Sequence, residues 1–345
     1  MTRDALPIIG ELFRCAEHDL IDVVSALGPY VLCCNDPPWS TLAPLLPPPT
    51  QVVQAWDMEL AHLESLDAVP DHADVVVGLG GGTALDTAKF LAWKNDRRLV
   101  QIPTITSVDA GFTDAIGVRS EGKVRYIGTV VPELVVLDIP VIQSAPGHLN
   151  RAGIGDILSC HTGLFDWRLA SDAGSGHAWD IELAALGRRL LADLDDAADD
   201  IAAVSTEGVR FMAQAYRHIG AACAAAGHSR FEEGSEHFWA YAYEHATGTH
   251  PIHGELIAMA VCAIAHVQGN DPQHAFDIVD RAGTRAHPAD LGVERDAFLR
   301  CLTGLAEYSR PEGLDVGIAD LDPISAPQAA AAWDFVDRLP RRSSN

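Results

Sequence analysis

Two histidines and one aspartate in the second half of the chain have the residue types of a metal site. Asp156 stands in the segment GIGDILS, His237 in EEGSEHFWAYAYEH and His253 in THPIHGELIAMAV. Each lies where a helix is predicted to begin, and a turn over residues 247–251 separates the two histidines. Two imidazoles and one carboxylate leave a coordination position open, which is the arrangement expected of a catalytic divalent metal.

The other histidines carry weaker signals, because the chain has 15 of them and an isolated histidine is usually structural. Three stand close enough in sequence to the metal-type residues to orient a ligand or relay a proton: His161, His245 and His250. A structural role is the simpler expectation for each of them.

A run of three glycines between a predicted strand and a predicted helix is the second chemical signal. The apolar run Val75–Leu79 is typical of a strand covered on both faces, and Gly80, Gly81 and Gly82 form a turn after it. Thr83 is the expected N-cap of the helix, and the strand Leu99–Ile102 completes a βαβ unit. The first helical turn offers unpaired N–H groups to an anion, so the turn predicts a nucleotide pyrophosphate site.

The same glycine run also fits an ordinary tight turn. Neither GxGxxG followed by an acidic residue nor GxxxxGK[ST] is matched, since the chain reads GGGxxxDxAK. Asp86 and Lys89, one helical turn apart, can pair with each other, or Lys89 can reach a ribose or a phosphate. Asp36, after the predicted strand Tyr30–Cys34, can accept a ribose hydroxyl or can be a solvated turn residue.

The elements around these residues predict an α/β half followed by a helical half. A helix is expected over residues 1–28, and further strands over 51–54 and 134–137. Residues 115–118 and 124–127 alternate around a turn and predict a β-hairpin. From about residue 146 onward the segments are rich in Ala and Leu with helical periodicity. We expect an α/β dinucleotide-binding domain over residues 1–145, with a parallel sheet and a β-hairpin, and an all-α domain over 146–345.

Composition excludes several classes of partner. The chain has 345 residues and a formal net charge of −24, which argues against nucleic acid and anionic membranes. No window approaches the roughly 18 to 20 apolar residues of a membrane span, and no signal peptide is recognisable. The seven cysteines form no CxxC pair. Free thiols in a reducing compartment are the simplest account, so we expect a cytoplasmic protein without membrane insertion.

Five segments in a fixed order make the chain similar to a known superfamily. They are GLGGGTALDTAK (78–89), PTITSVD (103–109), AGIGDILSCHTGLFDWRLA (152–170), GSEH (234–237) and HGE (253–255). The chain resembles the superfamily of iron-containing alcohol dehydrogenases, glycerol dehydrogenases, sn-glycerol-1-phosphate dehydrogenases and dehydroquinate synthases, and within it the glycerol-1-phosphate enzymes. The resemblance implies a dinucleotide-binding domain, a helical domain and an active site between them.

The resemblance also implies roles for individual residues. Asp156, His237 and His253 are expected to hold one divalent ion, with Zn²⁺ as the first expectation and Fe²⁺ or Ni²⁺ as alternatives. Asp109, which is expected to contact substrate hydroxyls, and His253 form the expected catalytic pair. Together with the residues singled out above, the expected NAD- or NADP-binding set is Asp36, Gly80, Gly81, Gly82, Thr83, Asp86, Lys89, Thr104 and Ser107.

Two departures from the family pattern fall beside the expected substrate site. The archaeal glycerol-phosphate enzymes read SHDG where this chain has residues 107–110 as SVDA. They also read GSEHxxSH, where this chain has Ala240 and Tyr241 in the last two places. Both changes bear on the substrate and leave the fold and the metal residues intact.

The expected reaction is reversible hydride transfer between NAD(P)H and a small polyol or polyol phosphate, with dihydroxyacetone phosphate and sn-glycerol 1-phosphate as the first pair. Oxidation of glycerol or another unphosphorylated alcohol is the alternative. A phosphate would need cations, for which Lys123, Arg125 and Arg151 are candidates. A dehydroquinate synthase-like cyclase is disfavoured, because its lysine after the first metal ligand is missing. A binding protein without activity is a further alternative. By resemblance we expect a homodimer or a higher homo-oligomer.

Overall fold

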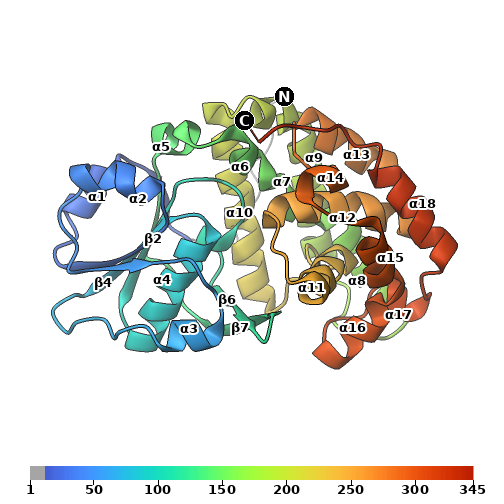
Figure 1. Ribbon diagram of the computed structural model, residues 1–345, viewed down its shortest axis with the longest axis horizontal. Helices are drawn as coiled ribbons and strands as arrows, with labels where there is room; N and C mark the ends of the chain where they lie inside the picture. Colours follow the sequence, from blue (N-terminus) through green and yellow to red (C-terminus); the bar gives the residue numbers. More distant parts are fainter. Residues whose placement is uncertain (1–11, 345) are drawn as a thin grey trace. The chain divides into compact units, whose positions relative to one another are not determined.

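The structure is a computed structural model that describes residues 12–344 (Figure 1). The described chain divides into two compact units. A sheet unit contains residues 12–145 and Tyr216–Ala225, and a helical unit contains Pro146–Ala215 and residues 226–344. Helix α10 (Thr206–Ala226) therefore contributes to both units, because its second half belongs with the sheet.

The sheet unit is built on six parallel strands. Their order across the sheet is β1-β8-β5-β4-β2-β3. The strands are β1 (Cys15–Glu17), β2 (Tyr30–Cys34), β3 (Gln51–Gln54), β4 (Val75–Gly80), β5 (Arg98–Pro103) and β8 (Leu134–Leu137). Every residue of β2 and of β4 is buried, as expected for central strands covered on both faces.

Helices and a hairpin cover the two faces of this sheet. The helices are α1 (Leu20–Ser25), α2 (Pro38–Leu42), α3 (Leu60–Glu64), α4 (Gly82–Asn95) and α5 (Ile139–Ser144). Strands β6 (Ala115–Ser120) and β7 (Lys123–Thr129) form the antiparallel hairpin. Alternate residues of β4 enter different cores: Val76 packs with α4 and the hairpin, whereas Val75 and Val77 pack with α1 and α2. The predicted βαβ unit and hairpin are confirmed.

Two local predictions about the sheet unit are wrong. Of the helix predicted over residues 1–28, residues 1–11 lie outside the described part, and the remainder forms β1 and the short α1. Strand β1 exists because it pairs with β8, far away in sequence, and local periodicity does not reveal such a pairing. Helix α4 begins at Gly82 with Gly81 as its N-cap, so Thr83 is inside the first turn and is not the cap.

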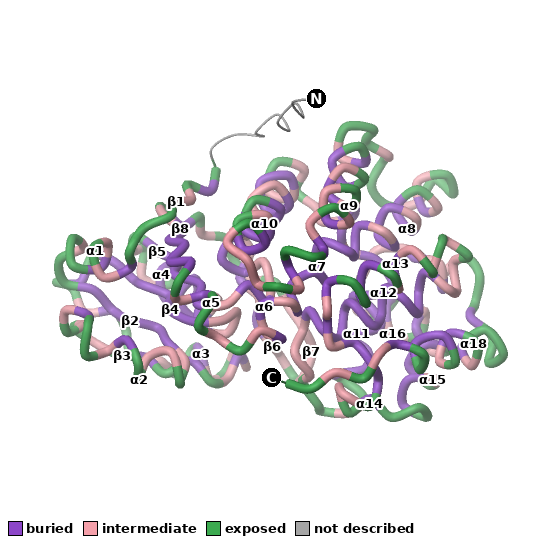
Figure 2. Tube along the Cα trace, turned by 90° about the horizontal axis from the view of Figure 1, so that it is seen from above, coloured by how far each residue is buried: buried purple, intermediate pink, exposed green. Residues whose placement is uncertain are grey.

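The helical unit is arranged around α12 (His253–Gln268). Residues 254–265 of α12 are all buried, and Figure 2 shows the helix mostly in the colour of buried residues. It packs against α7 (Ile154–Leu158), α8 (Cys160–Asp172), α11 (Ser235–Thr247), α13 (Pro272–Arg281) and α18 (Ala326–Val336). The remaining helices are α6 (Gly147–Ala152), α9 (Ile181–Ala202), α14 (Pro288–Leu291), α15 (Arg295–Thr303), α16 (Leu305–Glu312) and α17 (Ile318–Leu321).

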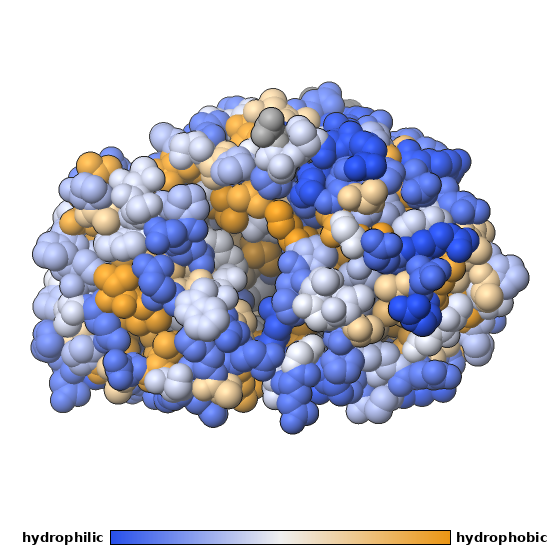
Figure 3. All heavy atoms as spheres, in the orientation of Figure 1, coloured by the Kyte–Doolittle hydropathy of each residue, from blue (hydrophilic) through white to orange (hydrophobic). Residues whose placement is uncertain are grey.

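The charged surface and the free thiols are those expected from the amino-acid composition. Hydrophilic residues gather over α13 in the view of Figure 3, and ion pairs such as Arg281 with Asp195 lie in this region. All seven cysteines are free. Among residues 12–344, no helix combines the length and the apolar character that crossing a membrane requires.

Candidate functional site

The three metal-type residues predicted from the sequence lie together in the helical unit. The side chains of Asp156, His237 and His253 each offer one ligand atom, and these atoms all lie within 4.8 Å of one another. His253 Nε2 is 3.4 Å from Asp156 Oδ1. Asp156 and His237 are buried, whereas the His253 side chain is 36% exposed, so the cluster is open on the His253 side.

Three helix starts bring these side chains together. His253 is the first residue of α12, while Asp156 and His237 are the third residues of α7 and α11. Gly155 and Gly254 let α7 and α12 approach closely, because a Cβ added to Gly155 would collide with the backbone carbonyl of Gly254. Each glycine adjoins a metal-type residue in the sequence, but no sequence pattern indicated this close approach.

A buried hydrogen-bond network holds His237 in place. Glu236, which is fully buried, lies with Oε1 2.9 Å from His237 Nδ1. The same carboxylate accepts hydrogen bonds from the Gly234 N–H at 2.6 Å and from the Thr162 hydroxyl at 2.7 Å. A carboxylate on Nδ1 orients the ring and leaves Nε2 as the nitrogen for a metal. Sequence reasoning missed Glu236 and Thr162, although Glu236 stands inside the GSEH segment.

The protonation of His237 is set by the same contact. Burial lowers the pKa of His237, but the hydrogen bond to Glu236 and its charge outweigh burial and raise the pKa to about 10. The contact with Glu236 thus favours the protonated imidazole. A divalent cation at Nε2 would compete with a proton there, so metal binding should release a proton.

The donor set fits a divalent transition metal. Two imidazoles and one carboxylate suit Zn²⁺, Fe²⁺ or Ni²⁺, and they leave a position for a further ligand. The short separations, the partly exposed His253 and the carboxylate behind His237 are the features such a site requires. The arrangement is thus suited to polarising an oxygen atom of a small molecule.

Polar side chains lie beside His237 and follow His253 in the sequence. The Tyr241 hydroxyl donates to Glu233 Oε1 at 2.7 Å, and the Tyr241 ring centroid is 6.1 Å from that of His237. Arg285 pairs with Glu255 at 3.0 Å, and burial nevertheless raises the pKa of Glu255 to about 7. Tyr241, one of the two departures from the family pattern, therefore lies beside a metal-type residue.

The three histidines considered as accessory groups have other contacts. His161 Nε2 donates to the Asn270 carbonyl at 2.6 Å. The His245 ring lies 6.0 Å from the Tyr308 ring, and His250 Nδ1 lies 3.4 Å from Glu244. These contacts agree with the structural roles expected for them.

The glycine turn lies at the switch point of the parallel sheet. Strands β2 and β4 are neighbours in the sheet, but the strand that follows each of them lies in the opposite direction. After β2 the chain continues to β3 at one edge, and after β4 it continues to β5 toward the other edge. The carboxyl ends of β2 and β4 therefore border the switch point. Open parallel sheets bind ligands at this place. Asn35, directly after β2, accepts a hydrogen bond from the Gly81 N–H at 3.3 Å. Sequence reasoning named its neighbour Asp36 and missed Asn35.

The turn has the backbone features of an anion cradle. Gly80 has a φ of +147°, which disfavours any other residue, and a Cβ there would also meet Asn35. No side chain caps α4, and the Ala84 N–H donates to the Gly81 carbonyl at 3.0 Å, so the N–H groups of Gly82 and Thr83 are those that face a ligand at the helix start. Because α4 is 14 residues long, its dipole favours a negative charge at this end.

A buried hydroxyl beside the turn has no partner among the described residues. The Thr104 N–H donates to the Gly80 carbonyl at 3.0 Å, and Thr104 Oγ1 is buried without a hydrogen bond. Such an orphaned polar atom is costly, so it points to a group that binds there. Ser107, three residues after Thr104, is also buried. The Ile105 side chain lies close to Gly81, and the Val108 side chain lies close to Gly82.

Lys89 and Asp86 contact each other, which is the first of the two alternatives left open above. Lys89 is fully buried, and its Nζ lies 2.9 Å from Asp86 Oδ1. The same ammonium group donates to the Thr113 hydroxyl and to the Ala115 carbonyl, both at 2.8 Å. The ammonium group is thus satisfied inside the protein by one ion pair and two hydrogen bonds, which tie α4 to the start of the hairpin.

The remaining predicted residues are placed as follows. Asp36 is exposed and accepts a hydrogen bond from the Ser40 N–H at 3.1 Å, as a turn residue does. Asp109 is half-buried in the sheet unit, where its carbonyl accepts from the Phe112 N–H at 2.7 Å. The metal-type residues belong to the helical unit, whereas Asp109 and the expected cofactor residues belong to the sheet unit.

The cations considered for a phosphate also have contacts within the protein. Arg125 donates to the Val124 carbonyl at 3.0 Å, and Arg151 donates to the Ala202 carbonyl at 3.3 Å. Burial lowers the pKa of Arg151, and the charge of Arg342 lowers it further. Lys123 begins β7 in the hairpin.

Comparison with known proteins adds an independent line of evidence. A family model described as iron-containing alcohol dehydrogenase matches residues 49–146. The chain is 31% identical over 267 residues to a glycerol-1-phosphate dehydrogenase [NAD(P)+] from Sulfolobus acidocaldarius, covering 76% of this chain and 75% of the relative. It is 29% identical over 262 residues to the enzyme of that name from Aeropyrum pernix, covering 76% and 74%.

Solved structures support the same fold. A probable glycerol dehydrogenase from Sinorhizobium meliloti superimposes with a TM-score of 0.70 at 20% identity, covering 95% of this chain and 96% of the other. At this identity the likeness concerns the fold, and it confirms an α/β sheet domain followed by a helical domain.

Proposed function

Because the chain belongs to the glycerol-1-phosphate dehydrogenase family within the iron-containing alcohol dehydrogenases, we propose that it reduces dihydroxyacetone phosphate with NAD(P)H to sn-glycerol 1-phosphate. In this reaction the carbonyl carbon gains a hydride and the carbonyl oxygen gains a proton, while NAD(P)H becomes NAD(P)⁺. The reverse reaction oxidises the secondary alcohol.

One observation carries the proposal: an aspartate and two histidines from three helices offer ligand atoms within 4.8 Å of one another. All three stand in segments that resemble those of the superfamily. We assign metal binding to Asp156, His237 and His253. A bound divalent cation, with Zn²⁺ as our first expectation and Fe²⁺ or Ni²⁺ as alternatives, would supply Lewis-acid polarisation of the substrate carbonyl.

The chain's own residues have the following proposed tasks. Gly80, Gly81, Gly82 and the first turn of α4 receive the pyrophosphate of the cofactor, and the Thr104 hydroxyl donates or accepts a hydrogen bond there. Glu236 keeps His237 in the orientation that offers Nε2. Asp109 contacts the substrate hydroxyls, and the proton on the new alcohol comes from water or a nearby imidazole.

Asp86 and Lys89 act in this scheme by supporting the helix that carries the pyrophosphate site. Their mutual ion pair and the two further contacts of Lys89 fix α4 against the hairpin. Asp36 and Ser107 remain candidates for cofactor contacts, and an acidic Asp36 near the adenosine ribose would disfavour the 2′-phosphate of NADP.

Oxidation of glycerol or of another unphosphorylated alcohol is the second candidate. Two observations favour it. Tyr241 lies beside His237 at a position where the family pattern has a histidine. Arg125 and Arg151, which were candidates for binding a phosphate, donate hydrogen bonds to backbone carbonyls. We further propose a cytoplasmic homo-oligomer, in keeping with free thiols and with the family resemblance.

A substrate panel separates these functions. Metal-loaded protein is mixed with NADH or NADPH and either dihydroxyacetone phosphate or dihydroxyacetone, and with NAD⁺ and glycerol in the reverse direction. We expect the highest kcat/KM with dihydroxyacetone phosphate. Faster turnover of dihydroxyacetone and glycerol would establish the second candidate. Absence of net NAD(P)H oxidation with every substrate would contradict both.

A further inference from the structure

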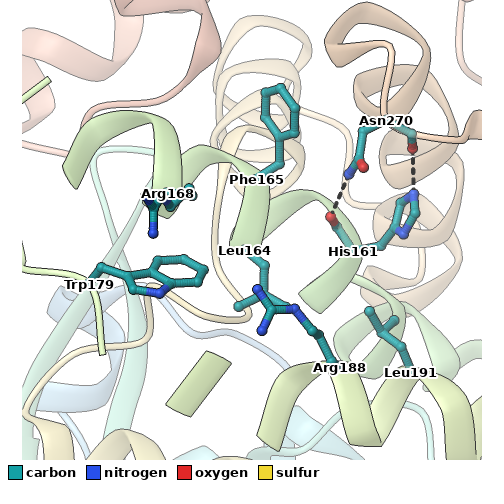
Figure 4. A pocket seen from close by; sticks show the side chains of 8 residues that line it. All are labelled: His161, Leu164, Phe165, Arg168, Trp179, Arg188, Leu191 and Asn270. Carbon is teal, nitrogen blue, oxygen red and sulfur yellow. Dashed lines mark hydrogen bonds between the residues drawn. The ribbon is translucent and has the colours of Figure 1, made fainter. Parts of the chain in front are cut away.

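A cavity in the helical unit lies between α8 and α9, outside the set of metal-type residues. Its volume is 310 Å³. Eight residues line it, as Figure 4 shows: His161, Leu164, Phe165, Arg168, Trp179, Arg188, Leu191 and Asn270. None of these residues has a role in the proposed hydride transfer, so that reaction does not explain the cavity.

The charge of the cavity is opposite to that of the chain. Two arginines line it and no carboxylate does, although acidic residues outnumber basic ones 48 to 24 in the whole sequence. Arg168 pairs with Asp172 at 2.8 Å. Arg188 has no ion-pair partner among the described residues, and the positions one turn away on α9 hold alanine and leucine. A cation without a partner is therefore available to a ligand.

Both guanidinium groups converge on one indole. The Cζ atom of Arg168 lies 5.3 Å from the Trp179 ring centroid, and that of Arg188 lies 5.7 Å from it. The charge of Arg168 is already balanced by Asp172, so Arg188 is the guanidinium beside the ring whose charge an anion would balance. Arginine also suits carboxylate and phosphate groups, which its planar fork binds through two hydrogen bonds.

The rest of the lining is aromatic, aliphatic or already hydrogen-bonded within the protein. The Trp179 N–H of the backbone donates to Ser171 Oγ at 3.0 Å, and the Trp179 ring lies 4.8 Å from the Trp167 ring. His161 and Asn270 exchange two hydrogen bonds on the opposite side, as the dashed lines in Figure 4 mark. Leu164 and Leu191 complete an apolar wall. Few side chains need to be ordered when a ligand enters, which favours binding.

We propose that this cavity binds a small organic anion, with its carboxylate or phosphate group on Arg188 and its flat apolar body against Trp179 and Leu164. The site is separate from the proposed dehydrogenase chemistry and does not depend on it. Its ligand class follows from one unpaired guanidinium, one aromatic face and an absence of carboxylates in the lining.

Calorimetric titration with phenyl phosphate tests the proposal on the full-length protein without NAD(P)H. Phenyl phosphate should bind at least about tenfold more tightly than phenol or inorganic phosphate, because only the whole molecule uses both the cation and the ring. Inorganic phosphate binding as tightly as phenyl phosphate would overturn the proposal, and so would a lack of any phenyl phosphate binding at millimolar concentration.

A matched pair of variants locates the binding. Arg188→Ala should weaken phenyl phosphate binding about tenfold or more. Arg189→Ala is the control, because Arg189 is the next residue on α9, pairs with Asp193 at 2.8 Å and does not line the cavity. An unchanged affinity in Arg188→Ala, or an equal loss in both variants, would overturn the proposal.

Tryptophan fluorescence provides a second readout. Phenyl phosphate should change the emission of the wild-type protein, and Trp179→Phe should remove most of that change while calorimetry still detects binding, since phenylalanine keeps an aromatic face. A smaller change can remain because the Trp167 ring lies 4.8 Å from the Trp179 ring. A change of undiminished size in Trp179→Phe would place the ligand elsewhere and contradict the assignment. Loss of dehydrogenase activity in any preparation leaves this test unaffected, because it measures binding alone.

Discussion

Glu236 Oε1 lies 2.9 Å from His237 Nδ1, and this contact decides which nitrogen of the histidine is available to a metal. The carboxylate is itself fixed by the Gly234 N–H and the Thr162 hydroxyl. Its position therefore depends on α8 and α11 together. A ligand oriented in this way loses less freedom when a metal binds, and its negative charge strengthens the donor nitrogen.

Replacing Glu236 with Gln should weaken metal binding about ten- to a hundredfold. The amide can keep the contacts to Gly234, Thr162 and His237, so the fold should persist while the negative charge behind the imidazole is lost. Competition with a chelator of known affinity, using Zn²⁺ and the metal-free protein, measures the change.

Glu244→Gln is the matched control for that experiment. Glu244 is a second buried glutamate on α11, and its carboxylate lies 3.4 Å from His250, which is not a metal-type residue. The affinity of this variant for Zn²⁺ should stay within about twofold of wild type, since a distant charge contributes little. Equal losses in both variants would show that Glu236 has no special role.

Thr104→Val tests the orphaned hydroxyl at the glycine turn. Valine keeps the shape of the side chain and removes Oγ1, which is buried without a partner among the described residues. The variant should bind NADH about two- to tenfold more weakly and be no less stable than wild type. Fluorescence titration with NADH measures the affinity.

The control for Thr104 is another buried threonine in the same unit. Thr87 Oγ1 already donates to the Thr83 carbonyl at 2.8 Å within α4, so Thr87→Val should leave the affinity for NADH nearly unchanged. If Thr104→Val binds NADH as tightly as wild type does, the hydroxyl has no part in cofactor binding.

Asp166 makes stability depend on pH. Burial raises its pKa from 3.8 to about 6, although hydrogen bonds from Ser235 lower it. The folded state therefore holds this proton more tightly than the unfolded state. As pH rises from about 4 to about 6, the unfolded state is favoured through this group by a total of about 3 kcal/mol, and the effect is constant at higher pH.

Asp166→Asn removes this dependence. At about pH 4 the variant should be less stable than wild type by about 1–3 kcal/mol, because an amide nitrogen replaces one of the oxygens that accept from Ser235, Gln268 and Ile318. The deficit should shrink as the pH rises to about 7. Urea unfolding of dilute protein at several pH values measures it, and a constant deficit would refute the raised pKa.

Local patterns in the sequence identified most of the fold. The apolar run Val75–Leu79, the hairpin around residues 120–122 and the strand Leu99–Ile102 were predictable, because burial and turn signals are contained within each segment. Strand β1 was not, since only its pairing with β8 makes it a strand. The N-cap at Gly81 was missed because threonine is the stronger capping residue on propensity alone.

Some residues of the candidate site could also be predicted from the sequence, and others could not. Asp156, His237 and His253 were predicted as a set because their residue types suit a metal and each stands in a segment that resembles the superfamily, and the structure places them close together. Asn35 was not, since it reaches Gly81 through the register of β2 with β4, which pairs Cys34 with Leu79. Glu236 was not, because the sequence does not show which neighbour of His237 faces its ring.

Metal content and activity of His253→Ala test the central claim most directly. His250→Ala is the control, because His250 is an exposed histidine near the start of the same helix and pairs with Glu244. Elemental analysis and the rate of NAD(P)H oxidation with dihydroxyacetone phosphate are measured on both variants and on wild type. We predict that His253→Ala loses both the bound metal and the activity while His250→Ala keeps both. Retention of either the metal or the activity by His253→Ala would contradict the proposed metal-dependent dehydrogenase.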